Sequence, residues 1–149
     1  MDSIDRKILR VLQQDARASL QQIGQAVGLS SSPCWERIRK LEVGGVIEGY
    51  TVRLNSQALG FNDTVLVQVT LDSHSDNTLE KFGETLAAIP EVIEAYLVSG
   101  EYDYLLRVAV RDTRDYERLL REKLYKIKGI RHSKSSFVLR TLKKADLPI

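Results

Sequence analysis

Apolar residues recur at helical spacing over the first 42 residues and predict three short helices. The first helix carries four of them at i, i+4, i+7 and i+8: Ile4, Ile8, Val11 and Leu12. The second begins at Ser19, because Ser19 and Gln22 have the spacing of a capping box, in which each side chain bonds the other residue's amide. Gly28 ends this helix, since glycine adopts the left-handed conformation without strain.

A third helix follows almost at once, with Ser30 as its N-cap. Pro33 falls in its first turn, where the missing N–H has no intrahelical partner in any case, and Gly44 ends it. Its inward stripe consists of Cys34, Ile38 and Leu41. A rotation of about 100° per residue leaves Trp35 and Arg37 on the flanks. The same rotation turns four polar side chains outward: Ser32, Glu36, Arg39 and Lys40.

The second and third helices, joined by the tight turn at 27–30, form a helix-turn-helix pattern over residues 20–41. In this arrangement the second helix of the pair enters the DNA major groove, while the first crosses the backbone. Arginine pairs bidentately with guanine, glutamate accepts from cytosine, and lysine and serine reach phosphates or base edges. Free amides at the helix start attract phosphate, so Ser31 joins Ser32 among the candidate DNA-binding residues. The alternative is a structural three-helix module whose charged face is merely solvated.

Beyond the third helix the period changes to two. Residues 46–54 alternate apolar and polar positions, which predicts a strand or small wing, and residues 55–62 are predicted to be a connector. We therefore expect a DNA-binding domain over residues 1–54, a linker over 55–62, and an effector-binding and oligomerisation domain over 63–149.

The second domain follows the order strand, helix, strand, strand, helix, strand. Strands are predicted at 65–71, 92–99, 103–110 and 131–140, and helices at 79–89 and 116–124. Phe137 and Leu139 share one face of the last strand. This is the βαββαβ ferredoxin-like order, so the fold class is α+β. Two helices cover only one face of such a sheet, and the apolar side chains expected on the other face predict self-association.

Composition places the chain among globular proteins, with 43% hydrophobic and 28% charged residues in 149. No stretch approaches the ~18 consecutive apolar residues of a spanning helix, and the first residues lack the features of a signal peptide. We expect a cytoplasmic protein without a membrane partner. The net charge of +2 lies entirely within residues 1–53, which permits a phosphate partner there.

The reactive residues do not predict catalysis. His74 and His132 are far apart and lack the spacing of a zinc site, and neither a P-loop nor a G-x-G-x-x-G motif occurs. The single cysteine, Cys34, cannot form an internal disulfide and is expected to be a small core residue. We predict no enzyme activity, no metal site and no cofactor.

Five short motifs stand out along the chain. Four lie in the first third: Asp-Ser-Ile-Asp-Arg-Lys-Ile-Leu at 2–9, Val-Gly-Leu-Ser at 27–30, Pro-Cys-Trp-Glu-Arg-Ile-Arg-Lys-Leu-Glu at 33–42, and Gly-Val-Ile-Glu-Gly-Tyr at 45–50. The fifth is Gly-Glu-Tyr-Asp-Tyr at 100–104. In this order they resemble the Lrp/AsnC family of bacterial and archaeal transcriptional regulators, nearly from end to end. One departure is Ser31, which stands where the family often has proline, while Pro33 occupies a second position that is common in the family.

The resemblance implies a winged helix-turn-helix followed by a βαββαβ effector domain of the RAM type. It implies double-stranded DNA and a small effector, commonly an amino acid, as partners, and homo-oligomers from dimers to octamers. It also marks Arg37 as a DNA-contacting arginine, although periodicity places Arg37 on the flank of its helix. The residues that we expect to bind DNA are Ser31, Ser32, Trp35, Glu36, Arg37, Arg39 and Lys40.

The turn at 99–104 is the candidate effector site. Its glycine, Gly100, permits close backbone approach, its free amides suit a carboxylate, and Asp103 suits an ammonium group. The resemblance implies an effector bound here, at an interface between dimers. The expected contacts are Ser99, Gly100, Tyr102, Asp103 and Tyr104, with Ser135 and Ser136 of the last strand as further candidates. The alternative is a plain turn in which Asp103 bonds nearby backbone donors.

These expectations combine into an amino-acid-responsive, sequence-specific transcriptional regulator. One alternative is an architectural protein that organises DNA with little sequence preference. Another is a ligand-sensing module without direct DNA contact.

Overall fold

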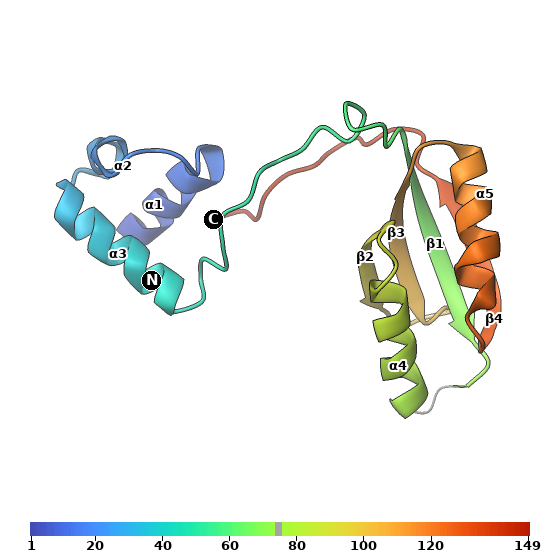
Figure 1. The fold of residues 1–149 in the computed structure, drawn as a ribbon. Helices are drawn as coiled ribbons and strands as arrows, with labels where there is room; N and C mark the ends of the chain where they lie inside the picture. Colours follow the sequence, from blue (N-terminus) through green and yellow to red (C-terminus); the bar gives the residue numbers. More distant parts are fainter. Residues whose placement is uncertain (74–75) are drawn as a thin grey trace. The chain divides into compact units, whose positions relative to one another are not determined.

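The computed structural model describes residues 1–73 and 76–149, and the side chains of all of these except 76–78. They form two compact units (Figure 1). The helical unit consists of Met1–Arg53 with Lys143–Ile149, and the sheet unit consists of Leu54–Leu142. His74 lies outside the described residues.

Three helices build the helical unit, as predicted: α1 (Ser3–Gln14), α2 (Leu20–Val27) and α3 (Ser31–Val43). The predicted capping box is confirmed. The Ser19 hydroxyl accepts from the Gln22 amide at 3.2 Å, and the Gln22 side chain accepts from the Ser19 amide at 2.7 Å. Gly28 ends α2 in the left-handed conformation, with φ 77°. Ser30 and Gly44 flank α3 at the predicted places, but the Ser30 side chain makes no capping hydrogen bond.

The core of the helical unit lies between the three helices, where Ile8, Ile23, Cys34 and Ile38 are buried together. Gly24 of α2 closes this core against the turn. Its carbonyl accepts from the amides of Gly28 and Leu29 at 2.8 and 2.9 Å. A Cβ at Gly24 would lie 2.3 Å from the Leu29 carbonyl oxygen, so the turn can pack this closely only against glycine.

The prediction of a strand over residues 46–54 is wrong. The chain folds back on α3, because the amides of Val46 and Ile47 both donate to the Leu41 carbonyl, at 2.9 and 3.1 Å. The Tyr50 hydroxyl then donates to Glu42 at 2.9 Å, and residues 48–55 belong to no helix or strand. An alternating segment forms a strand only where a neighbour pairs with its N–H and C=O groups. The described part of this chain supplies none there.

The last seven residues belong to the helical unit, which the sequence did not predict. Arg10 Nε of α1 donates to the main-chain oxygen of Ile149 at 2.6 Å, and the Gln13 amide donates to that of Leu147 at 3.2 Å. Arg10 and Gln13 are one turn apart on one helix face. The two carbonyls are two residues apart, as carbonyls on one side of an extended chain are.

The sheet unit confirms the βαββαβ order. Its elements are β1 (Asp63–Leu71), α4 (Asp76–Ala87), β2 (Val92–Leu97), β3 (Tyr104–Val110), α5 (Thr113–Glu122), the 3-10 turn η1 (Leu124–Lys126) and β4 (Ile130–Phe137). The antiparallel sheet has the order β2-β3-β1-β4. The last strand is shorter than predicted and ends at Phe137. Leu139 is 98% exposed beyond it, because the pairing of β4 with β1 stops at Val65 and Phe137.

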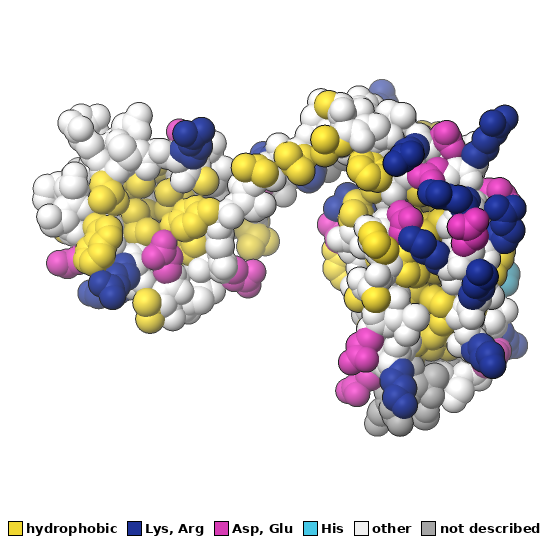
Figure 2. All heavy atoms as spheres, viewed as in Figure 1, with side chains coloured by type: hydrophobic (Ala, Val, Ile, Leu, Met, Phe, Trp, Pro, Cys, Tyr) yellow, Lys and Arg dark blue, Asp and Glu magenta, His cyan; other side chains and the backbone are white. Residues whose placement is uncertain are grey.

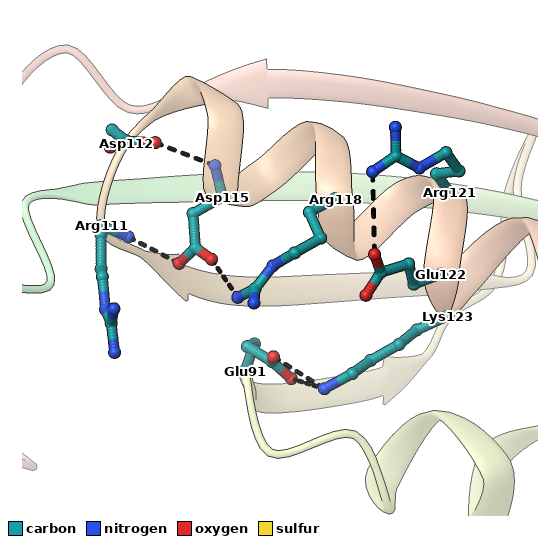
Figure 3. A network of polar contacts seen from close by, with 8 residues as sticks. All are labelled: Glu91, Arg111, Asp112, Asp115, Arg118, Arg121, Glu122 and Lys123. Atoms are coloured by element: carbon teal, nitrogen blue, oxygen red, sulfur yellow. Dashed lines mark hydrogen bonds and ion pairs between the residues drawn. The ribbon is translucent and has the colours of Figure 1, made fainter.

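Alternate residues of β1 and β3 face α4 and α5 and form the core of the sheet unit. They are Val65, Val67, Val69, Leu71, Tyr104, Leu106, Val108 and Val110. Phe82 and Leu86 of α4 and Tyr116 and Leu119 of α5 pack against them. Polar contacts fix α5 at both ends (Figure 3): Asp112 accepts from the Asp115 amide at 2.8 Å, and Lys123 donates to both carboxylate oxygens of Glu91.

The other sheet face is mixed rather than apolar. Leu66 of β1 is 36% exposed there, and Leu105 of β3 is half-buried. Between β2 and β3, however, Arg107 donates to both carboxylate oxygens of Glu94, at 2.7 and 2.5 Å. Figure 2 shows apolar side chains gathered on the viewed side of the helical unit, whereas charged side chains of both signs are interspersed over that of the sheet unit.

Candidate DNA-binding and effector-binding sites

Helix α3 has the two faces that the sequence predicts. Cys34, Ile38 and Leu41 are buried. Six of the predicted DNA-binding residues are exposed: Ser32, Glu36, Arg39 and Lys40 on the side away from this stripe, and Ser31 and Trp35 beside it. The exposed face therefore presents hydroxyls at the start of the helix, where backbone amides are unpaired, and two cations further along.

Trp35 and Arg39 form a pair on this face. The guanidinium carbon of Arg39 lies 5.2 Å from the centre of the Trp35 ring, and Trp35 is 48% exposed. The pair borders a shallow groove of about 480 Å³, lined by Trp35, Glu36, Arg39, Lys40, Val43 and Gly44. Val43, which the sequence pattern did not single out, also lines this groove and is 83% exposed. Val43 follows the buried Cys34 by nine residues, which at about 100° per residue places it on the opposite side of the helix. This spacing could have predicted its exposure.

Arg37 is placed differently from the other predicted DNA contacts. Its Nη1 lies 2.7 Å from the carboxylates of both Asp2 and Asp5, at the start of α1. The Asp5 amide and the Arg37 guanidinium together lower the pKa of Asp2 from 3.8 to about 2. In turn, Asp2 and Asp5 raise the pKa of Arg37. The guanidinium thus joins α3 to the capping box of α1, which consists of Asp2 and Asp5.

The predicted effector turn follows β2 and leads into β3. Ser99 and Gly100 are exposed, Tyr102 is half-buried, and Gly100 has φ 135°. Asp103 is held by backbone: one carboxylate oxygen accepts from the Leu71 amide at 2.7 Å, and its own amide donates to Val69 at 2.9 Å. Its carboxylate therefore bonds a backbone donor, but that donor belongs to β1, 32 residues away, and not to the turn itself.

Tyr104 and the two serines do not gather around this turn. Tyr104 is buried in the core and its hydroxyl donates to the Leu79 carbonyl. Burial raises the pKa of Tyr104, as does the charge of Asp103. Ser135 lies 2.5 Å from the Tyr116 hydroxyl on the helix-covered side of the sheet. Ser136 is the next residue of β4, so it points to the opposite face.

Family models cover most of the chain. Residues 1–42 match the AsnC-type helix-turn-helix domain, and residues 64–148 match the Lrp/AsnC ligand binding domain. The chain belongs to the Lrp/AsnC family of transcriptional regulators. The leucine-responsive regulatory protein of Escherichia coli K12 is 38% identical to it over 146 residues, which are 98% of this chain and 89% of the relative.

Solved structures of this family share the whole fold. An AsnC family transcriptional regulator from Agrobacterium tumefaciens has a TM-score of 0.94 at 40% identity, covering 99% of this chain and 97% of that one. A regulator from Neisseria meningitidis, solved as a complex with L-methionine, has a TM-score of 0.93 at 30% identity and covers 99% and 96%. A feast or famine regulatory protein from Mycobacterium tuberculosis, also complexed with L-methionine, has a TM-score of 0.87 at 33% identity and covers 99% and 98%.

The described residues form neither a membrane span nor a metal-binding cluster. Within the described residues, no helix is long and apolar enough to cross a membrane. Among those same residues, no three His, Cys, Asp or Glu side chains are grouped so that they would hold a metal ion.

Proposed function

We propose that this Lrp/AsnC regulator binds specific DNA sequences through the exposed face of α3 and responds to an amino acid bound at the turn 99–104. The observation that carries the DNA part is the division of α3 into a buried apolar stripe and an exposed polar face with two cations. A buried helix could not enter a groove, and an apolar face would gain nothing from DNA phosphates. The protein acts by binding rather than catalysis, in the cytoplasm where DNA is available.

The roles on α3 follow from position and chemistry. Ser31 and Ser32 lie at the helix start and bind phosphate together with the free amides there. Glu36 and Arg39 face base edges, and Lys40 neutralises phosphate. Arg37 acts through α1, since its guanidinium is paired with the carboxylates of Asp2 and Asp5.

An amino acid is the proposed effector. Two structural relatives were solved as complexes with L-methionine. At the turn, the exposed backbone around Ser99 and Gly100 offers N–H groups for a carboxylate, and Tyr102 lies beside it. Asp103 both holds the turn and supplies negative charge for an ammonium group, with a second subunit completing the site.

A homo-oligomer is the proposed working state. Leu66 and Leu105 give the uncovered sheet face apolar surface for a second copy. Two recognition helices in a dimer would then contact half-sites about 34 Å apart, or a multiple of that distance. For the effector to change DNA binding, it must bind one assembly more tightly than another.

Asp103→Asn tests the effector site. The amide oxygen of asparagine still accepts from Leu71, so the fold should persist, while the charge for an ammonium group is lost. Thermal-shift screening of the twenty amino acids should find one that raises the melting temperature of the wild type. The same amino acid should have little effect on Asp103→Asn. An equal shift in both proteins would place the effector elsewhere.

Competition binding tests the DNA part. At ~0.15 M salt, the protein should prefer the region upstream of its own gene over random DNA by at least about a thousandfold. Equal affinity for both would instead favour the architectural alternative. No binding to either would favour a ligand-sensing module.

A further inference from the structure

Trp35 and Arg39 contact each other outside the core of the helical unit. Trp35 is half-exposed, and Arg39 is exposed one turn later on α3. Their distance of 5.2 Å is within the about 6 Å over which a cation is attracted to an aromatic face. The contact therefore orders a surface side chain rather than joining helices.

Arg39 differs in this respect from Arg37, two residues earlier. The Arg37 guanidinium is held by the carboxylates of Asp2 and Asp5. Among the side chains and backbone that the structure describes, nothing forms a hydrogen bond or ion pair with the Arg39 guanidinium, so its N–H donors remain available while it lies over the Trp35 ring. An arginine that is held but not hydrogen-bonded is suited to bidentate donation to a ligand outside the protein.

We propose that Trp35 is a positioning residue for DNA specificity: its ring holds Arg39 where the guanidinium can donate to O6 and N7 of a guanine. This inference rests on the proposed function, in which α3 enters the major groove. Guanine is the base whose major-groove edge presents two acceptors in the spacing of the arginine fork. A free arginine side chain loses rotamer freedom when it binds, and one that is already ordered loses less.

Lys40 provides the contrast within the same groove. Its ammonium group is a compact charge, and no hydrogen bond or ion pair holds it within the described part of the chain. A lysine of this kind neutralises phosphate whatever the sequence. Arg39 and Lys40 should therefore have separable effects: one on the choice of sequence, the other on affinity for any duplex.

The experiment begins with a duplex that the wild-type protein selects from a randomised pool. Dissociation constants are then measured for this duplex, for the same duplex with 7-deazaguanine in place of guanine, and for a random duplex. The variants are Trp35→Ala, Trp35→Phe, Arg39→Ala, the double variant Trp35→Ala with Arg39→Ala, and Lys40→Ala. Circular dichroism checks that each variant keeps its helices.

Trp35→Ala should weaken binding to the selected duplex about tenfold, the equivalent of ordering one long side chain. It should leave binding to the random duplex unchanged and reduce the penalty for 7-deazaguanine. Trp35→Phe keeps an aromatic face and should stay within about threefold of the wild type. In the Arg39→Ala background, Trp35→Ala should have no further effect, because Trp35 acts through Arg39. Lys40→Ala should weaken binding to all duplexes and lower the salt slope by about one.

Three results would overturn the inference while leaving DNA binding by α3 intact. The first is a Trp35→Ala variant with wild-type specificity and the full 7-deazaguanine penalty. The second is a Trp35→Phe variant as defective as Trp35→Ala, which would make the indole itself the base contact. The third is a full effect of Trp35→Ala in the Arg39→Ala background. If the wild type selects no sequence, the proposed sequence-specific function itself fails, and this inference fails with it.

Discussion

The Arg37 guanidinium on α3 lies 2.7 Å from the Asp5 carboxylate on α1, and it also contacts Asp2. Asp2 and Asp5 are at the same time the two members of the capping box that begins α1. One arginine therefore links the helix that faces DNA to the first turn of the helix that supports it. Residues 2–9 and 33–42, which carry the family resemblance, meet at this contact.

Removing this link should destabilise the helical unit in a pH-dependent way. The pKa of Asp2 is lowered from 3.8 to about 2, by the Asp5 amide and then by Arg37. Its charged form thus stabilises the fold above about pH 4, and the stabilisation is lost as the pH falls through about 2. Arg37→Ala should melt at a lower temperature than the wild type at neutral pH, and the difference should shrink toward pH 2.

Thermal melts followed by circular dichroism measure this difference. Arg6→Ala is the control, because Arg6 is exposed on the same helix α1 as the two aspartates. A difference in melting temperature between wild type and Arg37→Ala that stays constant from pH 7 to pH 2 would contradict the ion-pair explanation.

Gly24→Ala should destabilise the helix-turn-helix. The added Cβ would lie 2.3 Å from the Leu29 carbonyl oxygen, so the turn must move. Overpacking of this kind costs about 1–3 kcal/mol, although alanine by itself favours a helix over glycine by about 1 kcal/mol. Urea unfolding followed by fluorescence reports the helical unit, because Trp35 is the only tryptophan of the chain.

Gly49→Ala is the matched control, since nothing lies within 4 Å of a Cβ at that position. Its midpoint of unfolding should equal or exceed that of the wild type. A Gly24→Ala protein as stable as Gly49→Ala would show that the turn adapts without cost.

The contact between α1 and the end of the chain should protect the tail from proteolysis. Arg10 and Gln13 hold the main-chain oxygens of Ile149 and Leu147, while Lys143 and Lys144 offer trypsin sites just before them. Arg10→Ala should therefore raise the rate of cleavage after these lysines several-fold, measured by mass spectrometry of the released peptide. In the control Arg6→Ala, cleavage should proceed as in the wild type. Equal rates in all three proteins would mean that the tail is not held in solution.

A charge on the uncovered sheet face should weaken self-association. Leu66 lies there on the central strand β1, and its replacement in Leu66→Glu would bury a carboxylate between two copies. Sedimentation should show a smaller species than the wild type at equal concentration. Tyr125→Glu, at a 63% exposed apolar residue of η1, makes a comparable change away from that face and is the control. An unchanged assembly in Leu66→Glu would exclude the uncovered face as the interface.

Local sequence pattern was enough to predict most of the secondary structure. The capping box at Ser19, the end of α2 at Gly28 and the inward stripe of α3 depend on contacts within a few residues, so periodicity and capping chemistry determine them. The strand predicted over 46–54 shows the limit of this reasoning. Alternation describes the side chains, whereas a strand needs a neighbour, and the nearest groups here belong to α3.

The roles of individual side chains depended on partners distant in the sequence to a greater extent than the secondary structure did. Asp103 and Tyr104 follow one another in the motif at 100–104, yet Asp103 bonds the Leu71 amide and Tyr104 bonds Leu79 from within the core. Ser135 and Ser136 are adjacent and face opposite sides of the sheet. Sequence neighbours on a strand cannot share a face, and the register of β4 on β1 decided which one faces the helices.

The sequence by itself determined the two-part organisation and the helix-turn-helix. It also determined which side chains of α3 are exposed, namely Ser32, Glu36, Arg39 and Lys40, because each of these features follows from short-range periodicity. Only the tertiary structure decided that Arg37 pairs with Asp2 and Asp5 and that the chain end lies on α1. Those contacts join residues more than thirty and more than one hundred positions apart. Pairings at such separations come from the packing of whole elements, and no local pattern encodes them.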